Sequence, residues 1–146
     1  MRLGLRTCAV LLVAVNVAGA QRLQPELRVD ALGPTLKLQP GAGVNLALGY
    51  YVRLGLAAGY EVWPDDRRKD AWRGDLLARF TFDPFRQQRW GLSVGGGLSV
   101  RRRTYLAAVA DLEGPEWHGV VPALQAGVSG GPRAAVILRR AVKGRR

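Results

Sequence analysis

The chain has 146 residues, which is enough for one domain. Its single cysteine and single histidine exclude a disulfide-stapled scaffold, a zinc finger and a multi-histidine metal site. Basic residues outnumber acidic ones by 22 to 11, and a net charge of +11 raises the question of a nucleic-acid partner.

The start of the chain predicts a secretory signal peptide. Two arginines precede an apolar run from Cys8 to Ala18, and small residues follow up to Ala20. The run is shorter than the roughly 20 residues that a membrane-spanning helix needs. The alternative is a buried N-terminal helix. We expect cleavage after Ala20, with a signal peptide over 1–20 and a mature domain over 21–146. Because exported proteins rarely meet DNA or RNA, nucleic acid is not the expected partner.

The rest of the chain repeatedly alternates apolar and polar residues with a period of two, which is typical of β-strands. Eight segments show this alternation: 26–32, 44–50, 54–62, 72–83, 90–101, 105–112, 117–129 and 133–140. Proline and glycine at 34 and 40–41 predict a loop after the first segment, and 130–132 predict a hairpin turn.

Four of the eight segments allow another interpretation. The second and third could form one bent strand, because the connection expected at 51–53 contains neither glycine nor asparagine. The segment 105–112 is small and apolar on both faces, so a short helix is an alternative. Pro122 counts against a regular central strand in the seventh segment.

The alternating segments have one nearly apolar face and one polar face. A soluble barrel or sandwich would turn the apolar face inward, whereas an outer-membrane barrel would turn it toward lipid. Two features favour the lipid-facing arrangement. The polar faces are rich in glycine, which a narrow, side-chain-filled interior needs. Aromatic residues also lie near the segment ends, as in the girdles at membrane interfaces. These aromatic residues are Tyr50, Tyr60, Trp63, Trp72, Phe80, Phe82, Trp90, Tyr105 and Trp117.

In these respects the chain resembles the small eight-stranded outer-membrane β-barrel proteins of Gram-negative bacteria. The resemblance covers the mature chain. It implies an all-β, antiparallel up-and-down barrel of about eight strands, no cofactor, and the outer membrane as location. It also implies outer-membrane lipid and the barrel assembly machinery as partners. Members of this group usually carry an aromatic residue at the end of the last strand, whereas this chain ends in Gly144-Arg145-Arg146.

In such a barrel the charges on the polar faces would point inward. An interior of eight strands is just wide enough to be filled by side chains, and unpaired buried charge is costly. We therefore predict an internal arginine–carboxylate network and no open channel. Its expected members are Glu26, Arg28, Asp30, Glu61, Arg73, Asp75, Arg79, Asp83, Arg101, Arg133 and Arg139.

No enzymatic site is favoured by the sequence. The glycine-rich stretches at 95–97 and 41–43 lack the lysine and hydroxyl residue of a nucleotide loop. A metal site at Glu113, Glu116 and His118 is not favoured, and no serine is tied to His118 as the only candidate base. We predict no catalytic residue, no cofactor and no metal. Basic clusters at 101–103 and 139–140 suggest lipopolysaccharide phosphates or anionic lipid headgroups as contacts.

The sequence thus predicts a non-enzymatic outer-membrane barrel, structural or interacting through its loops. The alternative is a soluble, secreted, lipocalin-like barrel that binds a small apolar ligand inside. The two differ in the direction of five apolar side chains: Leu46, Leu56, Leu76, Leu92 and Val136.

Overall fold

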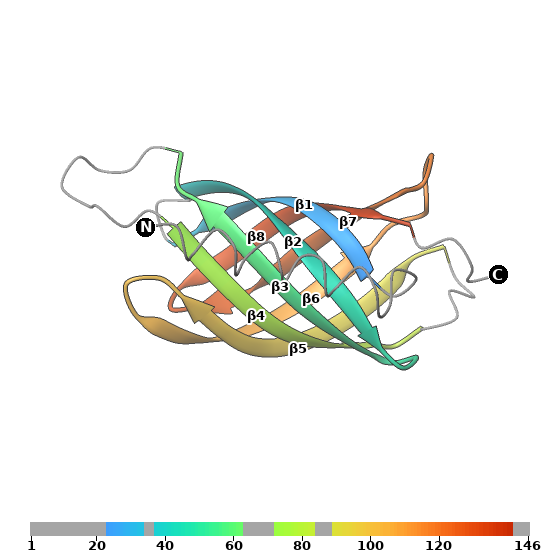
Figure 1. Ribbon diagram of the computed structural model, residues 1–146, viewed down its shortest axis with the longest axis horizontal. Coiled ribbons are helices and arrows are strands. Elements are labelled where there is room, and N and C mark those ends of the chain that lie inside the picture. Colours follow the sequence, from blue (N-terminus) through green and yellow to red (C-terminus); the bar gives the residue numbers. More distant parts are fainter. Residues whose placement is uncertain (1–22, 34–36, 63–71, 84–88, 142–146) are drawn as a thin grey trace, which may run out of the picture.

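The computed structural model describes residues 23–33, 37–62, 72–83 and 89–141. The predicted signal peptide with its cleavage site at Ala20, and Trp63, lie outside the described residues. The described chain forms eight antiparallel strands that close into a barrel in sequence order, as predicted (Figure 1). The strands are β1 (Leu23–Leu32), β2 (Lys37–Leu48), β3 (Val52–Tyr60), β4 (Trp72–Thr81), β5 (Gly91–Val100), β6 (Thr104–Glu113), β7 (Val120–Ser129) and β8 (Pro132–Arg140).

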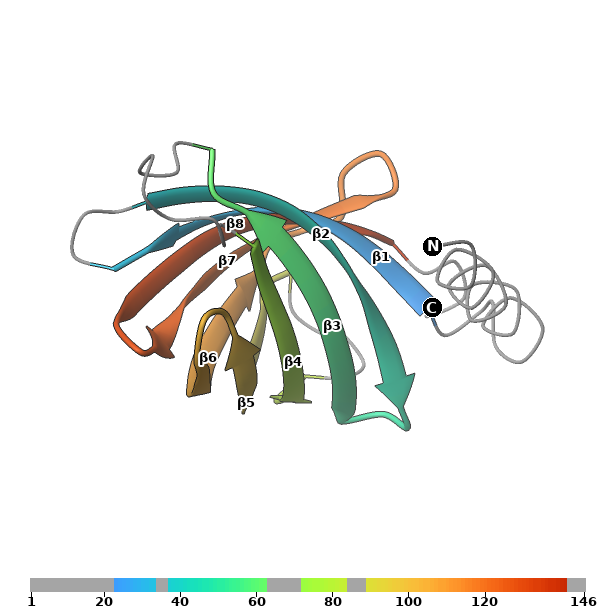
Figure 2. The ribbon, with the colours of Figure 1, turned by 60° about the vertical axis from the view of Figure 1, so that its left-hand side comes forward.

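Each strand pairs with the next, and β1 closes the barrel by pairing with β8 (Figure 2). We call the end where β1 begins and β8 ends the terminal end, and the opposite end the distal end. The terminal end carries the β2–β3, β4–β5 and β6–β7 connections. The distal end carries the other four, including a three-residue turn at 101–103 and a two-residue turn at 130–131.

The ambiguous segments are all strands. The β2–β3 turn covers 49–51 and uses Gly49 at a φ of 79°, a conformation that glycine adopts without steric cost. The connection predicted at 51–53 was therefore placed slightly too late. Residues 105–112 belong to strand β6, which removes the helical alternative.

Two prolines lie inside strands, although the sequence placed Pro40 in a loop and counted Pro122 against a regular central strand. Pro40 lies inside β2, which begins at Lys37 rather than at residue 44, and Pro122 lies inside β7. Each proline pairs with one neighbouring strand and lies just outside the registered pairing with the other, although the Pro122 carbonyl still accepts a hydrogen bond from the Gly114 N–H at 2.8 Å. Pro40 pairs with β1, while β2–β3 pairing starts at Gly41. Pro122 pairs with β8, while β6–β7 pairing starts beside it at Ala123. The missing N–H groups therefore cost the barrel little.

The barrel has an apolar outside and a polar inside. Leu27 is 65% exposed, whereas the next residue, Arg28, is 2% exposed. Of the outward positions in the eight strands, only Thr104 and Arg140 are neither apolar nor aromatic, and each stands at a strand end. The interior also holds apolar side chains, such as Leu77 and Ile137, between its charged ones.

Candidate functional site

The most distinctive site of the barrel is its charged interior. Five arginines and five carboxylates lie there, each at most 4% exposed, so the formal charges of this set cancel. These residues are Glu26, Arg28, Asp30, Arg73, Asp75, Arg79, Asp111, Glu113, Arg133 and Arg139. Because strand periodicity sends alternate residues to one face, four strands, β1, β4, β6 and β8, place all ten of these side chains inside.

Arg139 organises the half of the interior nearer the terminal end. Its Nε donates to Glu26 at 3.0 Å, its Nη1 to Glu113 at 2.6 Å and its Nη2 to Asp111 at 2.7 Å. Arg53, which is slightly exposed, donates to Glu113 at 2.7 Å. One guanidinium thus joins carboxylates from β1 and β6 to strand β8.

Asn45 completes this half on the β2 side. Its Nδ2 donates to Glu26 at 2.7 Å, and its Oδ1 accepts a hydrogen bond from Arg79 Nη1. Arg79 Nε also lies 3.2 Å from Asp111. Gly55 makes room for this arrangement, because a Cβ there would come within 2.7 Å of both Arg79 Nη1 and Asn45 Oδ1. The inward glycine on β3 and the large arginine on β4 are therefore complementary.

Asp30 organises the half nearer the distal end. Its carboxylate accepts hydrogen bonds from Arg28 at 2.7 and 2.8 Å, from Arg73 at 2.6 Å and from Arg133 at 3.1 and 3.2 Å. Arg133 also donates to Asp75 at 2.6 Å. Four polar atoms around Asp75 have no hydrogen-bond partner among the described residues: Arg73 Nε, Asp75 Oδ1, Ser99 Oγ and Arg133 Nη1. This half is thus less completely paired through the protein alone.

Arg28 connects the two halves. It donates to Glu26 at 3.1 Å in one half and to Asp30 in the other. It also donates to Gln125 at 2.7 Å, and Gln125 donates in turn to Asp111 at 2.7 Å. The interior is therefore one continuous hydrogen-bonded network rather than a set of isolated ion pairs.

The structure places three predicted network residues outside the buried set. Glu61 accepts from Lys37 at 2.8 Å just beyond the distal end of β3. Arg101 follows β5 at the same end, and Asp83 follows β4 at the terminal end. All three are only partly buried. In the sequence the alternation continues into these three positions, but in the structure strands β3, β4 and β5 end before them.

Several interior residues were missed by the sequence analysis. Asp111 and Glu113 end a strand whose other inward residues, such as Ala107 and Val109, are apolar, so no charged face was visible. The signal that could have identified them is the period of two, which continues from Val109 through Asp111 to Glu113. The sequence analysis also missed three uncharged side chains that hydrogen-bond to the charged groups, Gln39, Asn45 and Gln125. It missed one arginine as well, Arg53.

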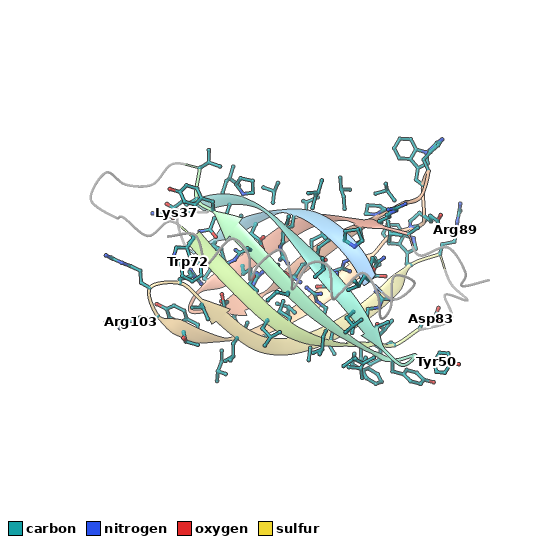
Figure 3. The ribbon with its side chains drawn as sticks, viewed as in Figure 1. Lys37, Tyr50, Trp72, Asp83, Arg89 and Arg103 are labelled. Carbon is teal, nitrogen blue, oxygen red and sulfur yellow. The ribbon has the colours of Figure 1, made fainter. Side chains whose placement is uncertain are left out.

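The predicted interface aromatics that the structure describes lie at or beyond the strand ends. Figure 3 labels Tyr50 at the terminal end and Trp72 at the distal end. Tyr51, which was not predicted, stacks on Phe80 with ring centroids 5.6 Å apart. Tyr105 departs from the predicted placement, because it shares the inward parity of Ala107 and is only partly exposed. The other described members are outward or in exposed connections: Tyr50, Tyr60, Trp72, Phe80, Phe82, Trp90 and Trp117.

The buried network pairs its opposite charges with one another. Each of its five carboxylates contacts at least one guanidinium, which holds it in place as a hydrogen-bond acceptor. The described residues bring together no group of His, Cys, Asp or Glu side chains that could hold a metal ion. They also include no helix with the length and apolar character needed to cross a membrane.

Comparison with known proteins supports the fold. The barrel is similar to the crystal structure of the N-terminal β-barrel domain of Pseudomonas aeruginosa OprF, with a TM-score of 0.56 and 14% sequence identity. The match covers 82% of this chain and 94% of that domain. No family model matches the sequence, and no curated protein is significantly similar to it. The chain therefore shares an eight-stranded barrel fold with that domain.

Proposed function

We propose that this chain is a non-enzymatic outer-membrane β-barrel protein with a side-chain-filled interior, structural or interacting through its loops. The observation that carries the proposal is the inverted distribution of polarity. Large apolar side chains cover the outside of the barrel, while ten charged side chains are buried inside it. A barrel surrounded by water would gain nothing from exposing this apolar wall, whereas a barrel surrounded by lipid requires it.

The dimensions of the wall support the same proposal. The strands have 9 to 12 residues. At roughly 3.3 Å per residue and a tilt of roughly 40°, ten residues cover about 25 Å along the barrel axis, the height of the apolar band in outer-membrane barrels. Aromatic side chains border the wall at both ends, including Phe80 at one end and Trp72 at the other. They would lie at the lipid headgroups.

The lipocalin-like alternative is not favoured. It requires an apolar interior and a polar exterior, but the interior holds the charged network. The outward residues Leu56, Leu76, Leu92 and Val136 are between 47% and 59% exposed, and Leu46 faces outward as well while being less exposed. The fold shared with the OprF barrel domain is consistent with the membrane proposal. Export by a signal peptide over 1–20, and insertion by the barrel assembly machinery, belong to the same proposal.

Cell fractionation combined with gel mobility tests this function. The full chain is expressed in a Gram-negative host, and the outer-membrane fraction is run on a denaturing gel with and without boiling. We expect the protein in that fraction, with a mobility that changes on boiling, because a closed barrel resists detergent until it is heated. A soluble periplasmic protein with no mobility shift would overturn the proposal.

A further inference from the structure

The turn between β5 and β6 consists of three consecutive arginines, Arg101–Arg103, which we call the arginine turn. The backbone N–H of Arg101 donates to the carbonyl of Arg103 at 3.0 Å, so the turn is closed by its own hydrogen bond. Three positive charges are thereby held within a single tight connection at the distal end of the barrel.

The first arginine of the turn is tied to Ser129, the last residue of strand β7. Its Nη2 donates to the carbonyl of Ser129 and lies 3.3 Å from the Ser129 hydroxyl. Its guanidinium carbon lies 5.1 Å from the centre of the Tyr105 ring. Gly130 lies against the same ring so closely that a Cβ there would overlap it. These contacts fix the arginine turn on the rim of the barrel.

The other two arginines are free to contact a ligand. Arg102 and Arg103 are exposed, and neither forms an ion pair within the described part of the chain. At the same end, Glu61 is already engaged by Lys37. Figure 3 places Arg103 at the distal end together with Lys37 and Trp72. Two guanidinium groups with ten N–H donors between them therefore extend from a rigid base.

The position of the arginine turn along the barrel axis determines which part of a membrane it would contact. Gly74 on β4 pairs with Val100 on β5, so Trp72, two residues nearer the distal end, stands level with the arginine turn. Just below the turn, Leu106 is 82% exposed on the apolar wall. Tryptophan marks the headgroup level of a membrane, and phosphates are the anionic groups at that level.

We propose that the arginine turn binds the phosphate groups of a phosphorylated membrane lipid, of the kind that lipopolysaccharide provides. This inference rests on the proposed membrane function. Arg102 and Arg103 contact the phosphate oxygens, and Arg101 holds the turn in position. Guanidinium groups suit this role because their planar forks bind phosphate through two parallel hydrogen bonds and stay charged at any physiological pH.

The test is native mass spectrometry of the refolded full chain in a phosphate-free maltoside detergent, with added lipid A or dephosphorylated lipid A. We expect lipid A to be retained and the dephosphorylated lipid to be lost. The variant R102S/R103S should lower lipid A retention roughly tenfold or more, since each basic side chain near a membrane surface contributes appreciably to anionic lipid binding. The matched control R89S/R140S removes two exposed arginines at the terminal end and should retain lipid A.

Each result decides the inference. Equal loss in both variants would show attraction by net charge alone and would overturn the site, as would equal retention of the two lipids. Displacement of lipid A by millimolar inorganic phosphate would assign the turn to free phosphate instead of lipid. A heat-dependent mobility shift is measured on every sample. Its absence from the unmodified chain would overturn the proposed membrane function itself, whereas a normal shift without lipid discrimination would overturn only the arginine-turn site.

Discussion

Glu26 and Arg139 pair across the seam where the first strand meets the last. The two residues are register partners, and the guanidinium Nε donates to the carboxylate at 3.0 Å inside the barrel. Because Arg139 also binds Asp111 and Glu113, the seam is tied to strand β6 as well as closed by backbone pairing. In a closed sheet with no free edge, this contact joins residues that are 113 positions apart in sequence.

Replacing Arg139 should therefore weaken the barrel strongly. Arg139→Met removes one guanidinium and leaves three buried carboxylates with fewer donors, a change that typically costs about 3–5 kcal/mol of unfolding free energy. Urea unfolding in detergent micelles, followed by tryptophan fluorescence, measures the loss. The control is Arg140→Met, which alters the next residue on the outward face and should leave the midpoint nearly unchanged. Similar midpoints for both variants would contradict the structural role of the network.

Asp30 offers a second test at the other end of the network. Asp30→Asn keeps the shape of the side chain but removes the negative charge that three arginines share, so we expect a loss of about 3 kcal/mol or more. The comparison is Glu61→Gln at the rim, where the partner Lys37 has a side chain 36% exposed. An ion pair in that setting contributes about 1 kcal/mol or less. A larger loss for the rim variant would argue against a buried hub at Asp30.

The strand pattern and the direction of the charged faces could be predicted because a period of two is a local property of the sequence. Arg28 and Asp75 point inward as their alternation indicates. Pro40 and Pro122 could not be interpreted locally, because the cost of a missing N–H depends on whether a neighbouring strand is paired at that point. That pairing follows from the stagger of the closed barrel.

The partners within the network were equally inaccessible from the sequence. Alternation predicts that Arg133 and Asp75 lie on the polar face, but not that they meet across the lumen. The sequence did not identify Asn45 and Gln125 as network members, because amide side chains on a polar face are also typical of solvated residues. In the structure each of them bridges charged groups in the interior. Only the three-dimensional closure of the sheet assigns these contacts.

Backbone crowding on the inner face of β5 leads to a third prediction. A Cβ at Gly97 would overlap the carbonyl oxygen of Leu76 and lie 3.0 Å from the Cα of Leu77, so the neighbouring backbone would have to move. Gly97→Ala should lower stability by roughly 1–3 kcal/mol. Gly74→Ala is the control, because the nearest atom to its Cβ would be in the Trp72 ring at an ordinary 3.5 Å. Urea midpoints measured in the same detergent should separate the two, and a stable Gly97→Ala barrel would show that the strands are less tightly apposed.

A charge on the outer wall tests the membrane proposal directly. Leu76 stands in the middle of β4, pairs with Leu56 and Leu98 on either side, and is 50% exposed. In a bilayer, Leu76→Arg would place a guanidinium near the centre of the apolar band at a cost of roughly 2–4 kcal/mol, whereas Thr104→Arg at a strand end should cost roughly 0–1 kcal/mol. The measurement is the urea midpoint of each variant refolded into phosphatidylcholine vesicles, with the boiling-dependent mobility shift as the sign of a formed barrel. A water-exposed wall would tolerate both arginines equally, so matching midpoints would mean that lipid does not surround this barrel.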